Sequence, residues 1–189
     1  MPFTPAGATI ALAAGLASAL HIGSGAIKLA TAVAAGVSTW LHSVPVVTVD
    51  VGAIGAGAGA IPLIVPPPAL ISGLTAGFAA QGILGPMSPL TILGLANGLS
   101  TAFAQATVIT THPGVGSGTC SVKFTGSSAV PAMIAGFASQ AMTTPGSIKM
   151  ATAIGIGLDI TFAAFATQSP IAGAPGPSPG GGAGFGVIV

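Results

Sequence analysis

The stretch AGLAS at residues 14–18 decides the fold, because it occurs three times in the chain. It recurs as AGFAA at residues 76–80 and as AGFAS at residues 135–139. The glycines of the three copies lie 62 and then 59 residues apart, at Gly15, Gly77 and Gly136. Similarity within one chain at a nearly fixed period is typical of repeat architectures. The sequence therefore predicts three repeats of about 60 residues.

Other motifs keep the same register. GVST at residues 36–39 matches GLST at residues 98–101, and the pair Gly157-Leu158 follows after another 59 residues. In the first and third copies, IKLATAV at residues 27–33 becomes IKMATAI at residues 148–154, and Phe3-Thr4 matches Phe124-Thr125. Several motifs in one register exceed what Ala/Gly-rich sequence produces by chance. We expect one domain, residues 1–189, made of the repeats 1–60, 61–119 and 120–189.

Each repeat is expected to contain two helices and two strands. The helices are an Ala-rich apolar segment of roughly 14 residues and a second of roughly 16 to 20, because Ala favours the helix. A short β-branched or aromatic run opens the unit, at Leu63–Val65 and at Val122–Phe124. A glycine ladder closes it; the three ladders are Gly55–Gly59, Gly114–Gly118 and Gly180–Gly186.

These elements predict an α+β fold with the order short strand, two apolar helices and Gly-rich strand in every repeat, in a pseudo-threefold arrangement. The β-branched runs before two ladders, Val46–Val49 and Val108–Thr111, also have strand composition. The two ends of the chain, Met1–Phe3 and Val187–Val189, are expected to complete the strand layer of this ring. Six glycines are predicted to be structural, because small residues allow close helix approach: Gly15, Gly77, Gly136, Gly36, Gly98 and Gly157.

Charged residues are nearly absent from the chain. Only 3% of the 189 residues are charged and 51% are hydrophobic, whereas soluble domains have about 25% charged residues. The charged residues are Lys28, Lys123, Lys149, Asp50 and Asp159. This composition excludes a nucleic-acid binder, which needs a basic surface to neutralise phosphates. It also predicts that lipid or other protein covers most of the surface.

Targeting and disulfide signals are weak. The sequence begins Met1-Pro2-Phe3 without a basic segment, so we expect no signal peptide and retention in the compartment of synthesis. Cys120 is the one cysteine and cannot form an internal disulfide.

The polar residues do not form a catalytic pattern. No Walker motif, catalytic dyad or nucleophile elbow is present, so we expect a protein that is not an enzyme and that has no cofactor. His112 and Cys120 flank one glycine ladder and are the only candidates for a partial zinc site. We prefer to interpret the histidines as residues at helix ends and the cysteine as a small buried residue. Asp159 lies within an apolar segment, where it is either a proton carrier in a membrane or, as we prefer, a polar residue at a solvent or partner face.

Two classes of protein explain the apolar composition. An integral membrane protein of helical hairpins, similar to proteolipids or channels, needs helices of about 20 residues. The first helix expected in each unit is shorter than that, and no aromatic or basic flanks set an orientation. A component buried in a large assembly needs only short apolar elements that neighbouring chains cover. The sequence favours the assembly and keeps the membrane protein as the alternative.

Three stretches resemble Gly/Ala-rich, repeat-containing virion structural proteins of tailed bacteriophages. They are the ladder Gly114–Gly118, the run Val122–Gly126 and the segment Met133–Phe137. The resemblance implies a component of the tail, in the baseplate, central spike or tail tip, with other virion proteins as partners. It also implies that a monomer with three repeats can cap a trimer, as spike-tip proteins of contractile systems do, although their Pro-Ala-Ala-Arg signature is missing here. Contact with a host membrane during entry stays open.

Overall fold

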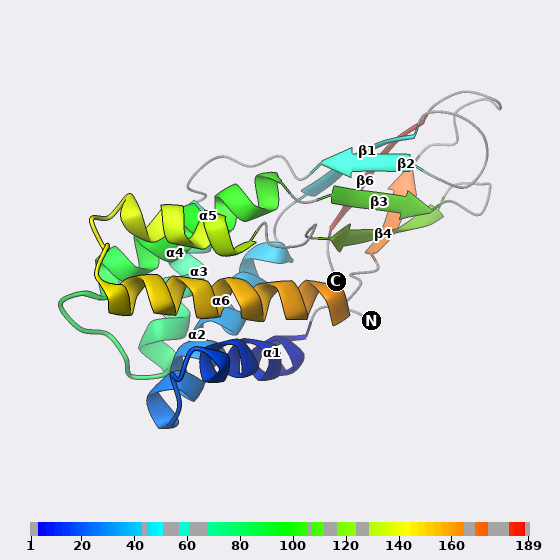
Figure 1. Ribbon diagram of the computed structural model, residues 1–189. Coiled ribbons are helices and arrows are strands. Elements are labelled where there is room, and N and C mark those ends of the chain that lie inside the picture. Colours follow the sequence, from blue (N-terminus) through cyan, green and yellow to red (C-terminus); the bar gives the residue numbers. More distant parts are fainter. Residues whose placement is uncertain are drawn as a thin grey trace.

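Six helices form the packed part of the molecule (Figure 1). The structure, a computed structural model, describes residues 4–42, 45–50, 57–60, 68–105, 107–111, 117–123, 129–164, 169–173 and 182–187, with side chains in 4–42, 68–105 and 129–163. The helices are α1 (Pro5–Ser18), α2 (Ser24–Leu41), α3 (Pro68–Ala80), α4 (Ser88–Ala104), α5 (Ala129–Ala138) and α6 (Pro145–Ala164). Local capping fixes some of their ends. The Thr4 hydroxyl accepts from the Gly7 N–H at 3.3 Å ahead of α1, and Thr144 accepts from Ser147 at 3.2 Å ahead of α6.

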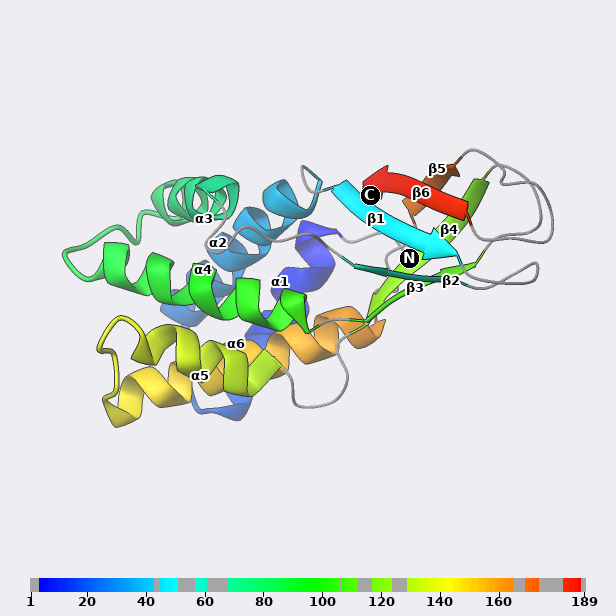
Figure 2. The ribbon, with the colours of Figure 1, turned by 90° about the horizontal axis from the view of Figure 1, so that it is seen from above.

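Six strands pair into a closed antiparallel barrel at one end of the helices (Figures 1 and 2). They are β1 (Pro45–Asp50), β2 (Gly57–Ala60), β3 (Thr107–Thr111), β4 (Ser117–Lys123), β5 (Ser169–Gly173) and β6 (Gly182–Val187). Each strand pairs with the next along the chain, and β6 closes the barrel on β1 from Pro45↔Val187 to Asp50↔Gly182. Closure gives each of the six described strands a partner on both sides, so none of them is an edge strand.

The predicted α+β fold class is wrong. Within residues 4–42, 68–105 and 129–163 the chain is all-helical, with six helices, 81% helix and no strand. The strand pairs follow the helix pairs along the chain, but in space they gather at one end of this packed body and do not mix with its helices (Figures 1 and 2). The physical reason is that apolar helices bury their faces best on one another, while short strands satisfy their backbone groups by pairing together.

The strands expected to open each repeat are also corrected. Val122 and Lys123 end β4, which begins at Ser117 inside the glycine ladder, so they form no separate element. Val187 belongs to β6 and pairs with Pro45. The expected strands Met1–Phe3 and Leu63–Val65 lie outside the described residues.

The helices pack in a cyclic order. The first helix of each repeat lies on the second helix of the preceding repeat: α3 on α2 and α5 on α4. The cycle is completed by α1, which packs on α6, the last helix of the chain. The strands repeat this order, because β2 pairs with β3, β4 with β5 and β6 with β1. The first and third repeats are therefore joined twice, once by helices and once by strands.

The six glycines singled out in the sequence lie at these helix crossings. A Cβ atom on Gly15 would meet Ala153 and Gly157 of α6, and one on Gly77 would meet Ala32 of α2. In the same way, a Cβ on Gly136 would meet Gly94 and Gly98 of α4. Their partners hold equivalent positions too: a Cβ on Gly36, Gly98 or Gly157 would lie 2.8, 2.9 or 2.7 Å from the Cα of Leu74, Met133 or Leu12, respectively. Three equivalent crossings result, each too close for a side chain.

The first helix of each repeat ends in the same turn. The backbone N–H of His21 donates to the carbonyl of Leu16, Ile83 N–H to Phe78, and Met142 N–H to Phe137. This six-residue hydrogen bond requires a left-handed residue just before its donor. Those residues are Leu20 (φ 63°), Gly82 (φ 64°) and Ala141 (φ 58°).

Glycine at the two other turns is expected to stabilise the protein. A left-handed conformation costs an L-residue about 1 kcal/mol, and Leu20 is 83% exposed, so its removal loses little burial. We expect Leu20→Gly and Ala141→Gly each to raise the free energy of unfolding by up to about 1 kcal/mol, reduced by the greater freedom of glycine in the unfolded chain. Gly82→Ala should lower it by a similar amount. Urea unfolding of the three variants provides the measurement, and a loss of stability in Leu20→Gly would contradict the argument.

Candidate functional site

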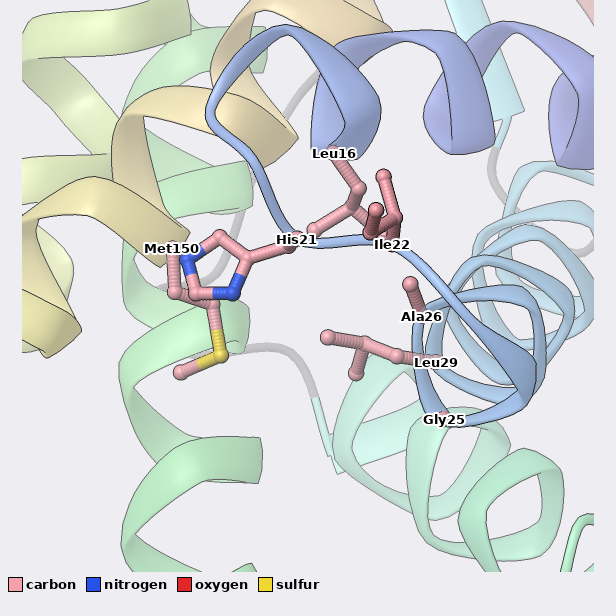
Figure 3. A pocket seen from close by; sticks show the side chains of 7 residues that line it. All are labelled: Leu16, His21, Ile22, Gly25, Ala26, Leu29 and Met150. Atoms are coloured by element: carbon pink, nitrogen blue, oxygen red, sulfur yellow. The ribbon is translucent and has the colours of Figure 1, made fainter.

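A pocket of about 170 Å³ lies at the turn between α1 and α2 (Figure 3). Its walls come from the end of α1, the connecting turn, the start of α2 and one residue of α6. Figure 3 shows His21 and Met150 on one side of the pocket and Gly25, Ala26 and Leu29 on the other. The lining residues are Leu16, His21, Ile22, Gly25, Ala26, Leu29 and Met150. The pocket therefore lies where the first repeat meets the third.

The repeats differ in one buried residue that lines this pocket. Leu16 occupies the position that Phe78 and Phe137 hold in the other repeats, and all three side chains are buried. A leucine fills less volume than a phenylalanine at the same place in the packing. The buried side chain at this position is therefore smaller in the first repeat than in the second and third.

His21 adds a polar group to this apolar pocket. Its Nε2 atom is buried and has no hydrogen-bond partner among the described residues. The equivalent residues, Ile83 and Met142, are apolar. Leaving a buried polar atom unpaired costs about 1–3 kcal/mol, so an uncompensated histidine is an unfavourable choice for folding alone.

An apolar surface surrounds the turns that join the paired helices. Four exposed hydrophobic residues lie on two of these turns: Leu20, Ile22, Leu84 and Met87. Ile27 and Ile148 add exposed hydrophobic side chains near the starts of α2 and α6. We call these six residues the distal face, because the turns lie at the end of the helices away from the barrel (Figures 1 and 2). Exposed apolar residues grouped in this way are typical of an interaction surface.

The side chains of the two candidate metal ligands lie outside the part of the chain that the structure describes. His112 lies outside the described residues, and Cys120 is placed only by its backbone, which pairs with Thr110 and Ser169. In the part of the chain that is described, no three His, Cys, Asp or Glu residues come together as a metal-binding group. His42 follows α2, where its Nδ1 donates to the Ser38 carbonyl oxygen at 2.7 Å.

Asp159 lies on α6 close to the beginning of α5. It accepts a hydrogen bond from the backbone N–H of Ala129, while its Oδ1 atom is buried and has no partner among the described residues. Burial raises the pKa of Asp159, and the hydrogen bond from Ala129 opposes this effect only in part. The equivalent residues, Ser38 and Ser100, are uncharged, so the carboxylate is the exception at this position.

We expect Asp159→Asn to stabilise the protein at neutral pH. Because the folded-state pKa is raised, the contribution of Asp159 to stability is largest below its ordinary pKa of about 3.8 and is lost as the pH rises through the folded-state value. Asparagine keeps an acceptor for Ala129 without a buried charge. Unfolding measured from pH 3 to pH 8 should show a smaller decline with rising pH in the variant. An equal decline in both proteins would show that the carboxylate carries no such cost.

Comparisons with known proteins provide no relative: no family model, no curated protein and no solved structure matches this chain. None of the helices in the described residues combines the length and apolar character needed to cross a membrane.

Proposed function

We propose that the protein is a structural component of a bacteriophage virion, located in the tail baseplate or at the central spike or tail tip. The observation that carries this proposal is the cyclic equivalence of the three repeats. Each repeat contributes a helix that packs on the preceding repeat, and the cycle closes between α1 and α6 and between β1 and β6.

Such a chain suits a position on a threefold axis. A trimeric partner presents the same surface three times around its axis, whereas an ordinary monomer can match only one of the three copies. A monomer with three nearly equivalent units can contact all three in similar ways. At the tip of a phage tail, a trimeric protein is followed by a single chain. A monomer with three nearly equivalent units suits that position.

The surface chemistry agrees with a buried position in an assembly. The distal face is apolar, and the chain has only three Lys and two Asp residues to keep it in solution. Neighbouring virion proteins would cover this face and remove its apolar area from water.

Fractionation of the native source tests the proposal. Lysates of producing cells are separated without detergent, and an antibody to this protein follows it through density gradients. Recovery with purified particles supports the virion role. Recovery only in a particle-free membrane pellet, released by detergent alone, contradicts it and supports the alternative of an integral membrane protein.

A pair of variants connects the role to the distal face. Ile22→Ser combined with Leu84→Ser should lower the amount of protein per particle by about tenfold, the effect of about 1.4 kcal/mol of lost binding. Ile10→Ser is the matched control, because Ile10 is 72% exposed on α1 outside the distal face. Equal incorporation of both variants would exclude the distal face as the contact.

A further inference from the structure

We infer that the distal face binds an acidic protein surface, one that places carboxylate groups against Lys28 and Lys149. This inference rests on the proposed function, because it names the chemistry of the virion protein that covers this face. Lys28 and Lys149 hold equivalent positions in the first and third repeats, and both side chains are exposed. They directly follow Ile27 and Ile148, two members of the distal face, so they add positive charge beside its apolar residues.

The two lysines have no described counter-charge at this end of the molecule. Asp159 is the one carboxylate side chain that the structure places, and it lies ten residues after Lys149 on α6, about 15 Å toward the barrel. Asp50 is described by its backbone alone, in β1 of the barrel. Charges of one sign on an interaction surface favour a partner of the opposite sign. The partner is therefore expected to carry carboxylates.

The helices do not need these lysines in order to form. The second repeat has Leu90 at the equivalent position, and α4 forms there without a cation. A cation near the start of a helix also gains nothing from the helix dipole, which is positive at that end. The chain has only three lysines, and two of them lie exposed at equivalent places beside one apolar face. This placement indicates a role in binding.

Leu20 gives independent support for the distal face as a contact surface. Its side chain is 83% exposed, and its backbone has a left-handed φ of 63°. That conformation is unfavourable for leucine, whereas Gly82 adopts it without cost at the equivalent position in the second repeat. An exposed apolar side chain in a strained turn lowers stability without a gain in packing. Such departures are expected at functional sites.

A protein suits this face better than a lipid surface or a second copy of the chain. Recognition of anionic membranes typically uses clusters of about four or more basic residues and aromatic anchors, whereas this face has two lysines and no aromatic residue. A second copy would bring its own lysines against these, and like charges repel. The hollow of about 170 Å³ at Ile22 also has space for an apolar side chain of a protein partner.

Carbodiimide cross-linking of purified particles tests the inference, because this reagent joins a lysine amine directly to a carboxylate in contact with it. We expect mass spectrometry to find Lys28 or Lys149 joined to an Asp or Glu of another virion protein. A cross-linked dimer of this chain would show self-association and overturn the inference. Particles that contain the chain without a link at either lysine would also overturn it, while the proposed function stands. Absence of the chain from particles would overturn the proposed function itself.

Charge reversal gives a second measurement. Lys28→Glu combined with Lys149→Glu should lower the amount of the chain per particle by more than about tenfold, and the matching pair of Gln substitutions by about threefold. Both side chains are exposed, so the melting temperature should stay unchanged. Lys123→Glu is the charge-matched control, because Lys123 belongs to β4 of the barrel, away from the distal face (Figure 1). Equal incorporation of the reversed and control variants would overturn the inference.

Vesicles of phosphatidylcholine and phosphatidylserine separate a protein partner from a membrane. We expect the purified full-length protein not to sediment with them. Sedimentation that is lost when Lys28 and Lys149 are both replaced by Glu would show that the two lysines bind lipid head groups, and it would overturn the inference.

Discussion

Replacing Gly136 with alanine is expected to lower the free energy of unfolding by about 3 kcal/mol, the upper range for overpacking a tight interior. A Cβ atom there would meet the carbonyl oxygen of Gly94 and would lie within 2.6 Å of the Cα of Gly98. Both are backbone atoms of α4, which cannot turn aside as a side chain can. The helices α4 and α5 must separate, and apolar contacts along the crossing weaken with them.

The same substitution in the other repeats tests whether the crossings are equivalent. Gly15→Ala and Gly77→Ala should lose similar amounts, because their Cβ atoms would meet backbone atoms of Ala153 and Ala32 at the corresponding places. Gly25→Ala is the matched control, since no atom lies within 4 Å of its Cβ position. It should be neutral or gain up to about 1 kcal/mol from helix propensity. Denaturant unfolding measures all four variants. If Gly136→Ala unfolded at the same denaturant concentration as Gly25→Ala, the close crossing would be disproved.

The local elements were largely predictable from the sequence. The two apolar segments of the first repeat are helices of 14 and 18 residues, close to the expected lengths, because Ala-rich apolar sequence favours helices within a short window. The repeat register also led to the six glycines that lie at the helix crossings. A residue that must be small recurs at the same position in every copy. This recurrence can be recognised from one sequence, without an alignment of relatives.

The arrangement of strands was not predictable in the same way. Pairing between β6 and β1 joins residues more than 130 positions apart. The sequence of a short strand does not identify the distant strand with which it pairs. Val122–Phe124 has strand composition, but composition cannot show that Val122 and Lys123 end a strand that starts at Ser117. The expected order of elements within a repeat was wrong for this reason.

The pocket at His21 escaped the search for motifs because it contains no motif. Its signal is the difference between repeats: Leu16 against Phe78 and Phe137, and a histidine against two apolar residues. Comparison of the copies position by position would have revealed it. The search for metal ligands named His112 and Cys120, whose side chains lie outside the described residues.

The aromatic contact between the second helices of the repeats carries the other large effect. Leu41, Phe103 and Phe162 hold equivalent positions near the ends of α2, α4 and α6, and all are buried. The Phe103 ring lies edge-on to Trp40, with centroids 4.8 Å apart, and edge-on to Phe162 at 5.3 Å. It therefore connects helices of all three repeats.

Truncating this ring should weaken the whole helical body. We expect Phe103→Ala to lower the free energy of unfolding by about 4 kcal/mol, since it loses the buried ring, its contacts with Trp40 and Phe162, and the packing around the resulting cavity. Phe103→Leu should lose less than half of that, because leucine is the residue at the equivalent position in the first repeat. Ile10→Ala, on an exposed side chain, should change stability by less than about 0.5 kcal/mol. The three variants are compared by denaturant unfolding. A loss below about 1 kcal/mol in Phe103→Ala would mean that the repeats are held together elsewhere. A large loss of stability with a single unfolding transition would support the view that the Phe103 ring couples the three repeats. Each repeat contributes one helix at this junction, so the unfolding of any repeat removes a neighbour of the ring.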